Sequence, residues 1–297
     1  IRCMLCLTVA DVCATNETLW NDWKRSLLSQ LFEFTTQQLA EQLDYQKEAE
    51  NNRAEALEIM KLALTPPQHK RLATYWANGS ESYFLRNKPT QLVWHALALL
   101  KQNQLPLILV SNEHARGATE IFIHCEDQKQ LFARIANILS KKKISIHDAQ
   151  IITSQNDLVF DSFIVTEQNG QALDETRCEQ IQQALQKELT EPQTKPFAVV
   201  KKPIKHQTFK RKTKTRFLAN SNQNQTAFEL FTLDREGLLA QVSQIFNQLD
   251  LILINAKITT IGERVEDFFV VSTQENQALS EEMKKTLKNI ITTELDS

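Results

Sequence analysis

The hydrophobic pattern divides the chain into a helical part and a mixed part. Over residues 1–104 the apolar residues recur at three- and four-residue intervals and almost never alternate. This spacing is typical of amphipathic helices. It predicts helices around Leu27–Leu39, over Asn51–Leu64 and from about Pro89 to Lys101. Beyond them the pattern changes, and Leu107–Val110 is predicted to be a short buried strand.

An internal repeat is the most informative feature of the mixed part. Thr119–Thr153 aligns with Thr226–Thr260 at a constant offset of 107 positions, and later identities such as Asp161/Asp267 follow at an offset of 106. Each copy has the pattern strand, helix, strand, strand, helix. This order predicts an α+β protein, in which an N-terminal helical part precedes two βαββαβ units.

A βαββαβ unit needs one more strand after its second helix. In the second copy the last helix is predicted to start at Ser280, which leaves too few residues before Ser297 for that strand. Two strand-like pieces lie between the copies, Phe197–Val200 and Gln207–Leu218. We therefore expect one of these pieces to complete each sheet, so that the two copies share strands.

The alternation slips in the strand that follows the first helix of each copy. Ile146 has one phase and Ala149 has the other, and the second copy slips at the same place. Such a slip predicts a β-bulge near Asp148 and another near Asn255. Because bulges often lie beside functional sites, these two residues are candidates for amide recognition, with solvated bulge residues as the equal alternative.

The composition excludes several enzyme classes. Of the 297 residues, 42% are apolar and 24% charged, as expected for a globular protein with a sizeable core. Five glycines occur and no two lie close together, which excludes a dinucleotide-binding loop, a Walker A loop and a nucleophile elbow. Five cysteines favour a reducing compartment over a disulfide framework. No stretch is long and apolar enough for a membrane span, so we expect a cytoplasmic protein without a membrane partner.

The net charge is −2, but the charges are unevenly distributed. Lys195–Arg216 contains nine Lys and Arg residues and no Asp or Glu. Few aromatic residues accompany them and no nucleic-acid-binding motif surrounds them, so we do not expect nucleic acid as a partner. Lysines protect exposed sheet edges, so we expect an edge strand here, with docking of an acidic partner surface as the second interpretation.

The turn that opens the first helix of each copy resembles the signature turn of ACT domains. Residues 234–239, DREGLL, follow a strand and match the ACT pattern D-x-x-G-L-L. Residues 127–132, DQKQLF, keep the Asp and the Leu but lack the glycine, so we expect a less open loop. ACT domains are small ferredoxin-like ligand-sensing modules, and the resemblance implies two ferredoxin-like βαββαβ ACT domains. We expect a helical region over 1–105, ACT domains over 106–190 and 225–297, and a basic strand-containing connector over 191–224.

The resemblance extends over essentially the whole chain to one enzyme family. The C-terminal half of PII-protein uridylyltransferase/uridylyl-removing enzymes is similar to the segments RGATEIFIHCEDQKQLFARI, ISIHDAQIITS, DSFIVTE and AKITTIGERVEDFFVVST. The upstream segment LTVADVCATNETLWNDWKRSLL resembles the end of that family's HD phosphohydrolase domain, and YFLRNKPTQLVWHALALL resembles the part between the HD and ACT domains. Because the chain starts with Ile1 in mid-pattern, we expect a fragment of a longer protein.

The resemblance implies an activity for the whole enzyme. The family is a nucleotidyltransferase that attaches UMP to the PII nitrogen-signalling protein and a hydrolase that removes it, with Mg²⁺ as the cofactor of the parent enzyme. The motifs of the transferase domain are absent from this sequence. Among the HD metal ligands a late Asp alone has a counterpart, Asp11, and a hydrolytic metal site needs several ligands. We therefore expect this chain alone to be inactive, without catalytic residues or a cofactor of its own.

The ACT turns are the predicted ligand sites. Free N–H groups at the start of each helix suit the carboxylate of an amino acid. Asp127 or Asp234 would contact the ammonium group or cap the helix, and capping is the favoured role. Gly237 would allow close approach of the backbone or form a plain tight turn. The candidate glutamine-binding residues are Asp127, Gln130, Leu131, Asp148, Asp234, Gly237, Leu238 and Asn255.

Two functional hypotheses follow from the resemblance and the turns. The favoured one is a glutamine-sensing regulatory region of the enzyme that uridylylates and deuridylylates PII, in which glutamine shifts a conformational equilibrium. The alternative is a non-catalytic module for dimerisation or PII docking that binds no amino acid. The expected partners are the PII protein, L-glutamine as an effector, and further copies of the chain through the ACT domains.

Overall fold

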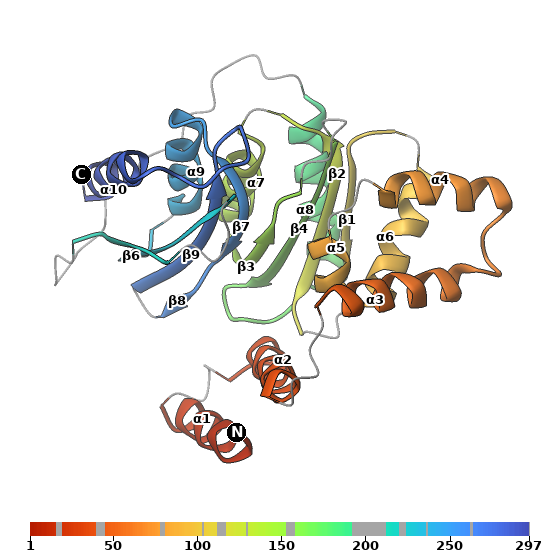
Figure 1. Cartoon of the computed structure of the whole chain (residues 1–297), viewed down its shortest axis with the longest axis horizontal. Helices are drawn as coiled ribbons and strands as arrows, with labels where there is room; N and C mark the ends of the chain where they lie inside the picture. Colours follow the sequence, from red (N-terminus) through yellow and green to blue (C-terminus); the bar gives the residue numbers. More distant parts are fainter. Residues whose placement is uncertain are drawn as a thin grey trace.

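The computed structural model describes residues 1–15, 20–39, 45–77, 81–102, 104–111, 117–128, 130–152, 158–191, 212–219, 224–235, 237–261 and 264–296. A helical part comes first along the chain, and one antiparallel sheet with its own helices follows (Figure 1). The helical part consists of α1 (Arg2–Thr15), α2 (Asp22–Leu39), α3 (Tyr45–Met60), α4 (Pro66–Ala77), α5 (Glu81–Arg86) and α6 (Pro89–Lys101). The predicted α+β class is confirmed, as are the bounds of the last of these helices.

Helices α3 to α6 pack into one apolar cluster that continues onto the sheet. Trp76 of α4 and Leu92 of α6 are buried in it, and Phe122 of the sheet belongs to the same cluster. Helix α4 begins at two prolines, and the Thr65 N–H donates a hydrogen bond to Gln68 Oε1 at 2.8 Å just before them. This is half of a capping box, which satisfies a donor that the helix leaves free.

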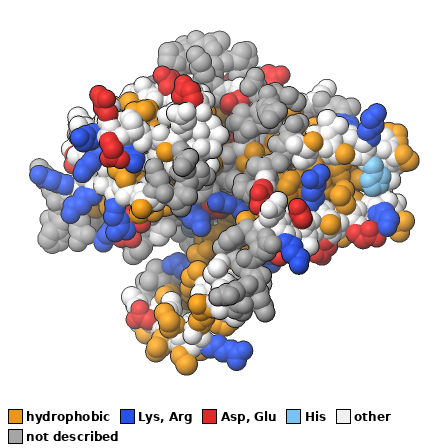
Figure 2. Space-filling model, viewed as in Figure 1, with side chains coloured by type: hydrophobic (Ala, Val, Ile, Leu, Met, Phe, Trp, Pro, Cys, Tyr) orange, Lys and Arg blue, Asp and Glu red, His pale blue; other side chains and the backbone are white. Residues whose placement is uncertain are grey.

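Helices α1 and α2 lie apart from this cluster and expose apolar side chains (Figures 1 and 2). Helix α2 buries Trp23, which contacts Ala118 and Ile164 of the first copy. The predicted apolar stripe of α2 instead faces solvent, with Leu31 60% exposed and Leu39 68% exposed. Among the described residues, no helix is both long enough and apolar enough to cross a membrane.

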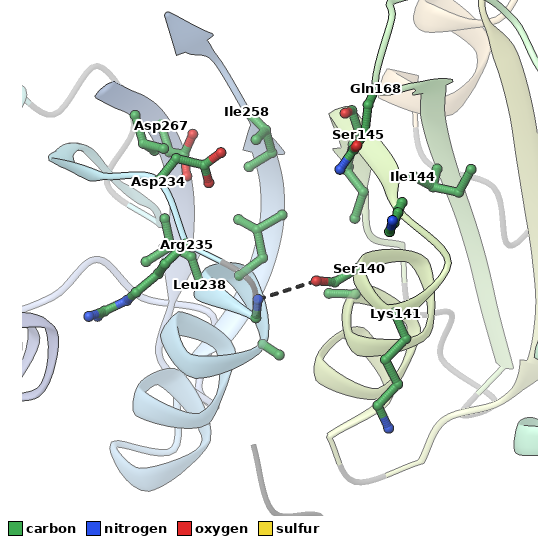
Figure 3. Close-up of a pocket in the computed structure, with 17 residues that line it drawn as sticks. Ser140, Lys141, Ile144, Ser145, Gln168, Asp234, Arg235, Leu238, Ile258 and Asp267 are labelled. Atoms are coloured by element: carbon green, nitrogen blue, oxygen red, sulfur yellow. Dashed lines mark hydrogen bonds between the residues drawn. The ribbon is translucent and has the colours of Figure 1, made fainter. Parts of the chain in front are cut away.

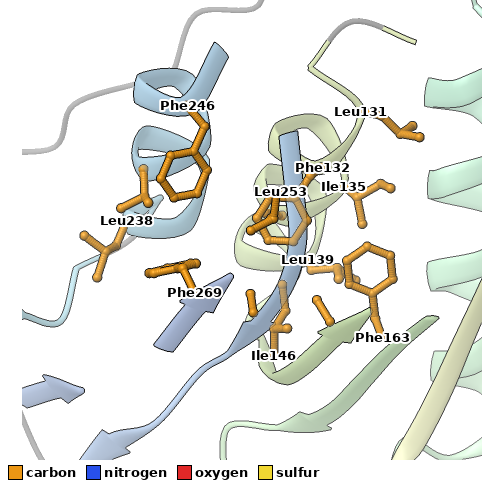
Figure 4. Packing of buried hydrophobic residues seen from close by; sticks show 14 of the residues in the cluster. Leu131, Phe132, Ile135, Leu139, Ile146, Phe163, Leu238, Phe246, Leu253 and Phe269 are labelled. Carbon is orange, nitrogen blue, oxygen red and sulfur yellow. The ribbon is translucent and has the colours of Figure 1, made fainter. Parts of the chain in front are cut away.

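The sheet has nine strands, in the order β1-β2-β4-β3-β7-β9-β6-β5 with β8 paired to β9, and all the pairs are antiparallel. The first copy consists of β1 (Leu107–Ser111), β2 (Thr119–Glu126), α7 (Leu131–Lys141), β3 (Ile144–Gln150), β4 (Leu158–Glu167) and α8 (Glu175–Thr190). The second consists of β5 (Lys214–Phe217), β6 (Thr226–Leu233), α9 (Leu238–Gln248), β7 (Ile252–Lys257), β8 (Thr260–Ile261), β9 (Arg264–Ser272) and α10 (Glu281–Asp296). Helices α7 to α10 bury their apolar faces in one cluster that both copies share (Figure 4).

The two copies join through their equivalent strands β3 and β7. Ala149 lies opposite Ala256, and these residues correspond to each other at the repeat offset of 107. Helices α7 and α9 pack against each other over the same junction. Because equivalent strands pair antiparallel about equivalent residues, an approximate two-fold axis passes through this alanine pair and relates the two copies.

The fourth strand of each copy precedes the repeat instead of following it. Strand β1 pairs with β2, and β5 pairs with β6, in the place of the last strand of a βαββαβ unit. The expectation for Gln207–Leu218 is confirmed for the second copy by its described part, Lys214–Phe217. For the first copy the expected connector strand is wrong, because β1 holds that place and Gln182 Nε2 of α8 donates to Ile108 O at 2.7 Å. Phe197–Val200 lies outside the described residues.

Two smaller predictions about the strands are confirmed. The register shifts between Ile146 and Asp148 in β3 and between Leu253 and Asn255 in β7, so both bulges exist. Strand β5 forms one edge of the sheet, and Lys214 and Arg216 point to solvent there. The described part of the basic segment is therefore a charged edge strand, which discourages pairing with other chains.

Candidate functional site

A pocket opens between the two copies where α9 begins (Figure 3). Its volume is about 400 Å³, which lies within the range of about 300–1,000 Å³ typical of small-molecule sites. The first copy contributes the end of α7 and the start of β3, and the second contributes the turn before α9. Polar and charged lining residues include Ser140, Lys141, Lys143, Ser145 and Gln168 of the first copy and Asp234, Arg235 and Asp267 of the second.

The residues that precede the two equivalent helices share a left-handed backbone conformation although they are of different types. Gly237 is the N-cap residue of α9 with a φ of 82°, and Gln130 is the N-cap residue of α7 with a φ of 60°. A left-handed conformation costs a residue with a side chain about 1–2 kcal/mol. Gln130 therefore adopts, at a cost in strain, the conformation that Gly237 adopts without one, and the prediction of a less open first loop stays a prediction.

The aspartates of the turns are not the N-cap residues, so the capping role that the sequence favoured for them is not found at that position. Helices α7 and α9 begin directly after Gln130 and Gly237; the Gln130 side chain makes no capping hydrogen bond, and Gly237 has no side chain to make one. Asp234 lies at the pocket and remains exposed to solvent. Desolvation by the surrounding atoms raises the pKa of its carboxyl.

The start of α9 presents hydrogen-bond donors to the pocket. The first N–H groups of a helix have no partner within the helix. The Gly237 N–H donates to Ser140 Oγ of α7 at 3.2 Å, so a side chain of the first copy occupies one of these donors (Figure 3). Lys141 and Lys143 line the pocket from the same copy. Backbone N–H groups and ammonium groups together favour an anionic ligand group here.

A buried carboxylate that the sequence analysis did not select lies beside Asp234. Asp267 of β9 is 1% exposed, and its Oδ1 accepts a hydrogen bond from the Thr259 N–H at 3.1 Å. Burial raises the pKa of Asp267 well above its usual range, and the charge of Asp234 raises it further. The signal was present in the sequence, because Asp267 shares the inward phase of Val265 and Phe269 in an otherwise apolar strand face.

Asp148 and Asn255 do not line this pocket, although both lie at the bulges as predicted. Asn255 is 4% exposed, and its Nδ2 donates to Ala149 O of the first copy at 3.2 Å. Its amide therefore joins β7 to β3. Of the eight predicted ligand-binding residues, the pocket brings together Asp234, Gly237 and Leu238.

The remaining predicted residues lie at the start of α7. The approximate two-fold axis relates this position to the pocket at the start of α9. Asp127, Gln130 and Leu131 lie at the start of α7, where Asp234, Gly237 and Leu238 lie at the start of α9. The charges differ between the two places. Lys141 and Lys143 of the pocket correspond to Gln248 and Asp250 at the repeat offset of 107. The related place therefore lacks both lysines and gains a carboxylate.

A buried polar network joins the helical part to the first copy. His95 of α6 and Glu120 of β2 are 0% and 1% exposed, and His95 Nε2 lies 3.2 Å from Glu120 Oε1. The Tyr83 hydroxyl lies 2.9 Å from His95 Nδ1, and Gln91 Nε2 donates to the other oxygen of Glu120. Sequence periodicity does not reveal this network, because its members come from three separate elements.

Asp11, the predicted remnant of a metal site, lies exposed on α1. In the part of the chain that the structure describes, no group of three or more His, Cys, Asp or Glu side chains could hold a metal ion. A catalytic metal needs several protein ligands around one ion. The described residues therefore do not form a site for the Mg²⁺ that the resemblance implies for the parent enzyme.

Two family models match separate stretches of the chain. Residues 44–98 match the family model described as the uridylyltransferase GlnD fifth domain, and residues 119–182 match the ACT domain model. A bifunctional uridylyltransferase/uridylyl-removing enzyme of Pasteurella multocida (strain Pm70) is 46% identical over 291 residues, which are 96% of this chain and 33% of that protein. The protein of the same name from Haemophilus influenzae (strain PittEE) is 43% identical over 293 residues, which are 97% of this chain and 34% of that protein. The chain thus spans about a third of the length of these curated relatives.

Proposed function

Because the chain belongs to the family of bifunctional uridylyltransferase/uridylyl-removing enzymes and spans about a third of the length of its curated relatives, we propose that its two ACT-like copies form the glutamine sensor of such an enzyme. The observation that carries this proposal is the pocket between the copies. It has the volume of a small-molecule site, and the turn that matches the ACT signature forms one of its walls.

The proposed effector fits the chemistry of the pocket. Glutamine carries a carboxylate, an ammonium group and an amide. The first turn of α9 offers N–H donors for the carboxylate, Asp234 offers an acceptor for the ammonium group, and Gln168 and Ser145 offer polar partners for the amide (Figure 3). A sensor that responds to millimolar glutamine needs about −4 kcal/mol of binding free energy.

The pocket also suggests how binding is transmitted. A ligand shifts a conformational equilibrium only if it binds one state better than the other. Glutamine in this pocket contacts both copies, so its affinity depends on their relative placement. In the complete enzyme this bias would set the balance between UMP transfer to the PII protein and its removal. The His95–Glu120 pair would carry movement of β2 to the helical part.

We assign glutamine to the turn of the second copy. The equivalent turn of the first copy faces Gln248 and Asp250 in place of two lysines, and an acidic residue there opposes a carboxylate. The proposal therefore expects one glutamine for each chain.

Calorimetric titration of the 297-residue chain tests the proposal, with L-glutamate as the control ligand. Saturable heat with L-glutamine alone, at one ligand per chain, would support it. A folded chain that gives no heat with L-glutamine would contradict a self-contained sensor. That result would favour the alternative, a module for dimerisation or PII docking that binds no amino acid.

A further inference from the structure

The Asp267 carboxyl is unusual because one of its two oxygens is buried without a partner. Oδ1 accepts a hydrogen bond from the Thr259 N–H at 3.1 Å, whereas Oδ2 has no hydrogen-bond partner among the described residues. The residue lines the pocket, and its carboxyl lies beside that of Asp234 (Figure 3). A buried polar atom left without a partner is costly, and it commonly marks a place where a water, an ion or a ligand binds.

We propose that Asp267 and Asp234 together hold the ammonium group of an α-amino acid in the pocket. This inference rests on the proposed function and adds a second carboxylate to the site. An ammonium group has three N–H donors, which suit the unpartnered Oδ2 of Asp267 and the exposed carboxyl of Asp234. A cation between them also removes the repulsion between two neighbouring carboxylates.

The opposite charges of the pocket are arranged to suit a zwitterion. In Figure 3 the two carboxyls lie above the hydrogen bond between Ser140 and the start of α9, and Lys141 extends away from them. The other cationic residues of the lining are Lys143 and Arg235, and Arg235 Nη1 donates to Leu295 O at 3.0 Å. A carboxylate at the start of α9 and an ammonium group at the aspartates would therefore each meet groups of opposite charge.

The first copy contains a matched residue without a place in this pocket. Asp161 is 1% exposed, its Oδ1 accepts from the Ile152 N–H at 3.1 Å, and its Oδ2 also has no partner among the described residues. The backbone hydrogen bond is thus common to both copies and is structural. Asp161 is not part of the lining of the pocket. Substitution of Asp161 therefore reproduces the structural effect of substituting Asp267 without touching the proposed ligand.

The test compares Asp267→Asn with Asp161→Asn in the complete 297-residue chain. Each variant is titrated with L-glutamine and with 4-carbamoylbutanoate, which has hydrogen in place of the ammonium group. A charge-assisted hydrogen bond contributes enough to change affinity by about ten- to a hundred-fold. We expect Asp267→Asn to weaken L-glutamine binding by about that factor and to leave binding of the analogue unchanged. Asp161→Asn should leave the affinity for L-glutamine within about two-fold of the unsubstituted chain.

Several outcomes would overturn the inference. One is an Asp267→Asn chain that binds L-glutamine as well as the unsubstituted chain. Another is an equal loss for both ligands, which would mean that Asp267 shapes the pocket without contacting the ammonium group. If Asp267→Asn does not fold, Asp234→Asn at the exposed carboxyl takes its place with the same expectation. An unsubstituted chain that binds no L-glutamine would overturn the proposed function, and this inference with it.

Discussion

Ala149 and Ala256 occupy equivalent positions in the two repeats and lie directly opposite each other across the β3–β7 ladder. In a symmetric dimer of identical chains every contact about such an axis occurs twice. Here both copies lie in one chain and their sequences differ. A contact made in one copy therefore has an equivalent in the other copy, where different residues form it. Each residue of one copy can therefore be tested against its counterpart in the same molecule.

Lys143→Asp gives the pocket the charge that Asp250 provides at the related place. Lys143 and Asp250 have similar φ angles, 60° and 51°, so the substitution introduces no new backbone conformation. We expect the affinity for L-glutamine to fall about three- to ten-fold, because an anion replaces a cation beside the carboxylate. The loss should shrink at high salt.

The neighbouring Lys142→Asp is the control for this substitution. Lys142 is also exposed but does not line the pocket. Calorimetry should show an affinity within about two-fold of the unsubstituted chain. An equal loss in both variants would mean that net charge, and not the position of Lys143, governs binding.

Gly237 and Gln130 should respond in opposite directions to substitution. Gly237→Ala places a side chain in the left-handed region, and we expect it to lower the free energy of unfolding by about 1 kcal/mol or more. Gln130→Gly relieves the same strain in the first copy and should raise it by a few tenths to about 1 kcal/mol. Urea unfolding measures both values. A Gly237→Ala chain as stable as the unsubstituted one would contradict this account.

The sequence predicted the repeated elements well because their signals are local. The helix over Pro89–Lys101, the two bulges and the turn at Gly237 each depend on a few neighbouring residues. The fourth strand was misplaced for the first copy because any exposed edge can accept several candidate strands, and pairing is decided by tertiary contacts such as that of Gln182 with β1. Asp267 was missed because strand phase shows that a residue points inward, not whether a pocket lies there.

Arg134 of α7, which contacts the end of α8, belongs to an exchange between the copies that the sequence pattern alone did not reveal. Arg134 is 1% exposed, and its Nε lies 3.1 Å from Glu188 Oε1. Its Nη1 contacts Gln128 Oε1, and Gln128 Nε2 donates to Leu189 O at 3.4 Å. Arg134 Nη2 also donates to Glu188 O, so the guanidinium contacts a carbonyl group in the last turn of α8, where positive charge is favourable.

In the second copy the two residue types have changed places. Arg235 corresponds to Gln128 and Gln241 corresponds to Arg134, and both side chains donate to carbonyl groups at the end of α10. We expect Arg134→Gln to destabilise the chain by about 2 kcal/mol, because it removes charge-assisted hydrogen bonds of a buried group. Adding Gln128→Arg should recover part of this loss in urea unfolding. Strict additivity of the two changes would rule out the exchange.

Docking of α2 should be sensitive to acid through His147. The imidazole ring of His147 stacks on the Trp23 ring, with the two ring centroids 5.5 Å apart, and its Nε2 lies 2.8 Å from Thr166 Oγ1. Burial, aided by the positive charge of Lys24, lowers the pKa of His147 to about 4. The docked state therefore binds fewer protons than the open state between pH about 6.5 and about 4. Its stability is complete above this window and falls as the pH drops through it.

Limited proteolysis within α2 at pH 7 and pH 5 measures this effect. We expect faster cleavage at pH 5, with a loss of docking free energy that approaches about 3 kcal/mol near pH 4. His147→Phe should abolish the pH dependence because its ring cannot be protonated. His69→Phe, on α4, should retain it. A pH dependence that survives in the His147 variant would assign it to another group.

The Ser140 hydroxyl competes with any ligand for a donor of the pocket. This hydroxyl accepts the Gly237 N–H that a ligand carboxylate would use. Ligand entry at this donor is therefore an exchange, in which one internal hydrogen bond is given up for each new one. The net gain in binding free energy is smaller than for an open donor. The apparent affinity equals the intrinsic affinity multiplied by the fraction of time that the donor is free. For a sensor of the proposed kind, one hydroxyl group would thus raise the concentration at which the signal turns on.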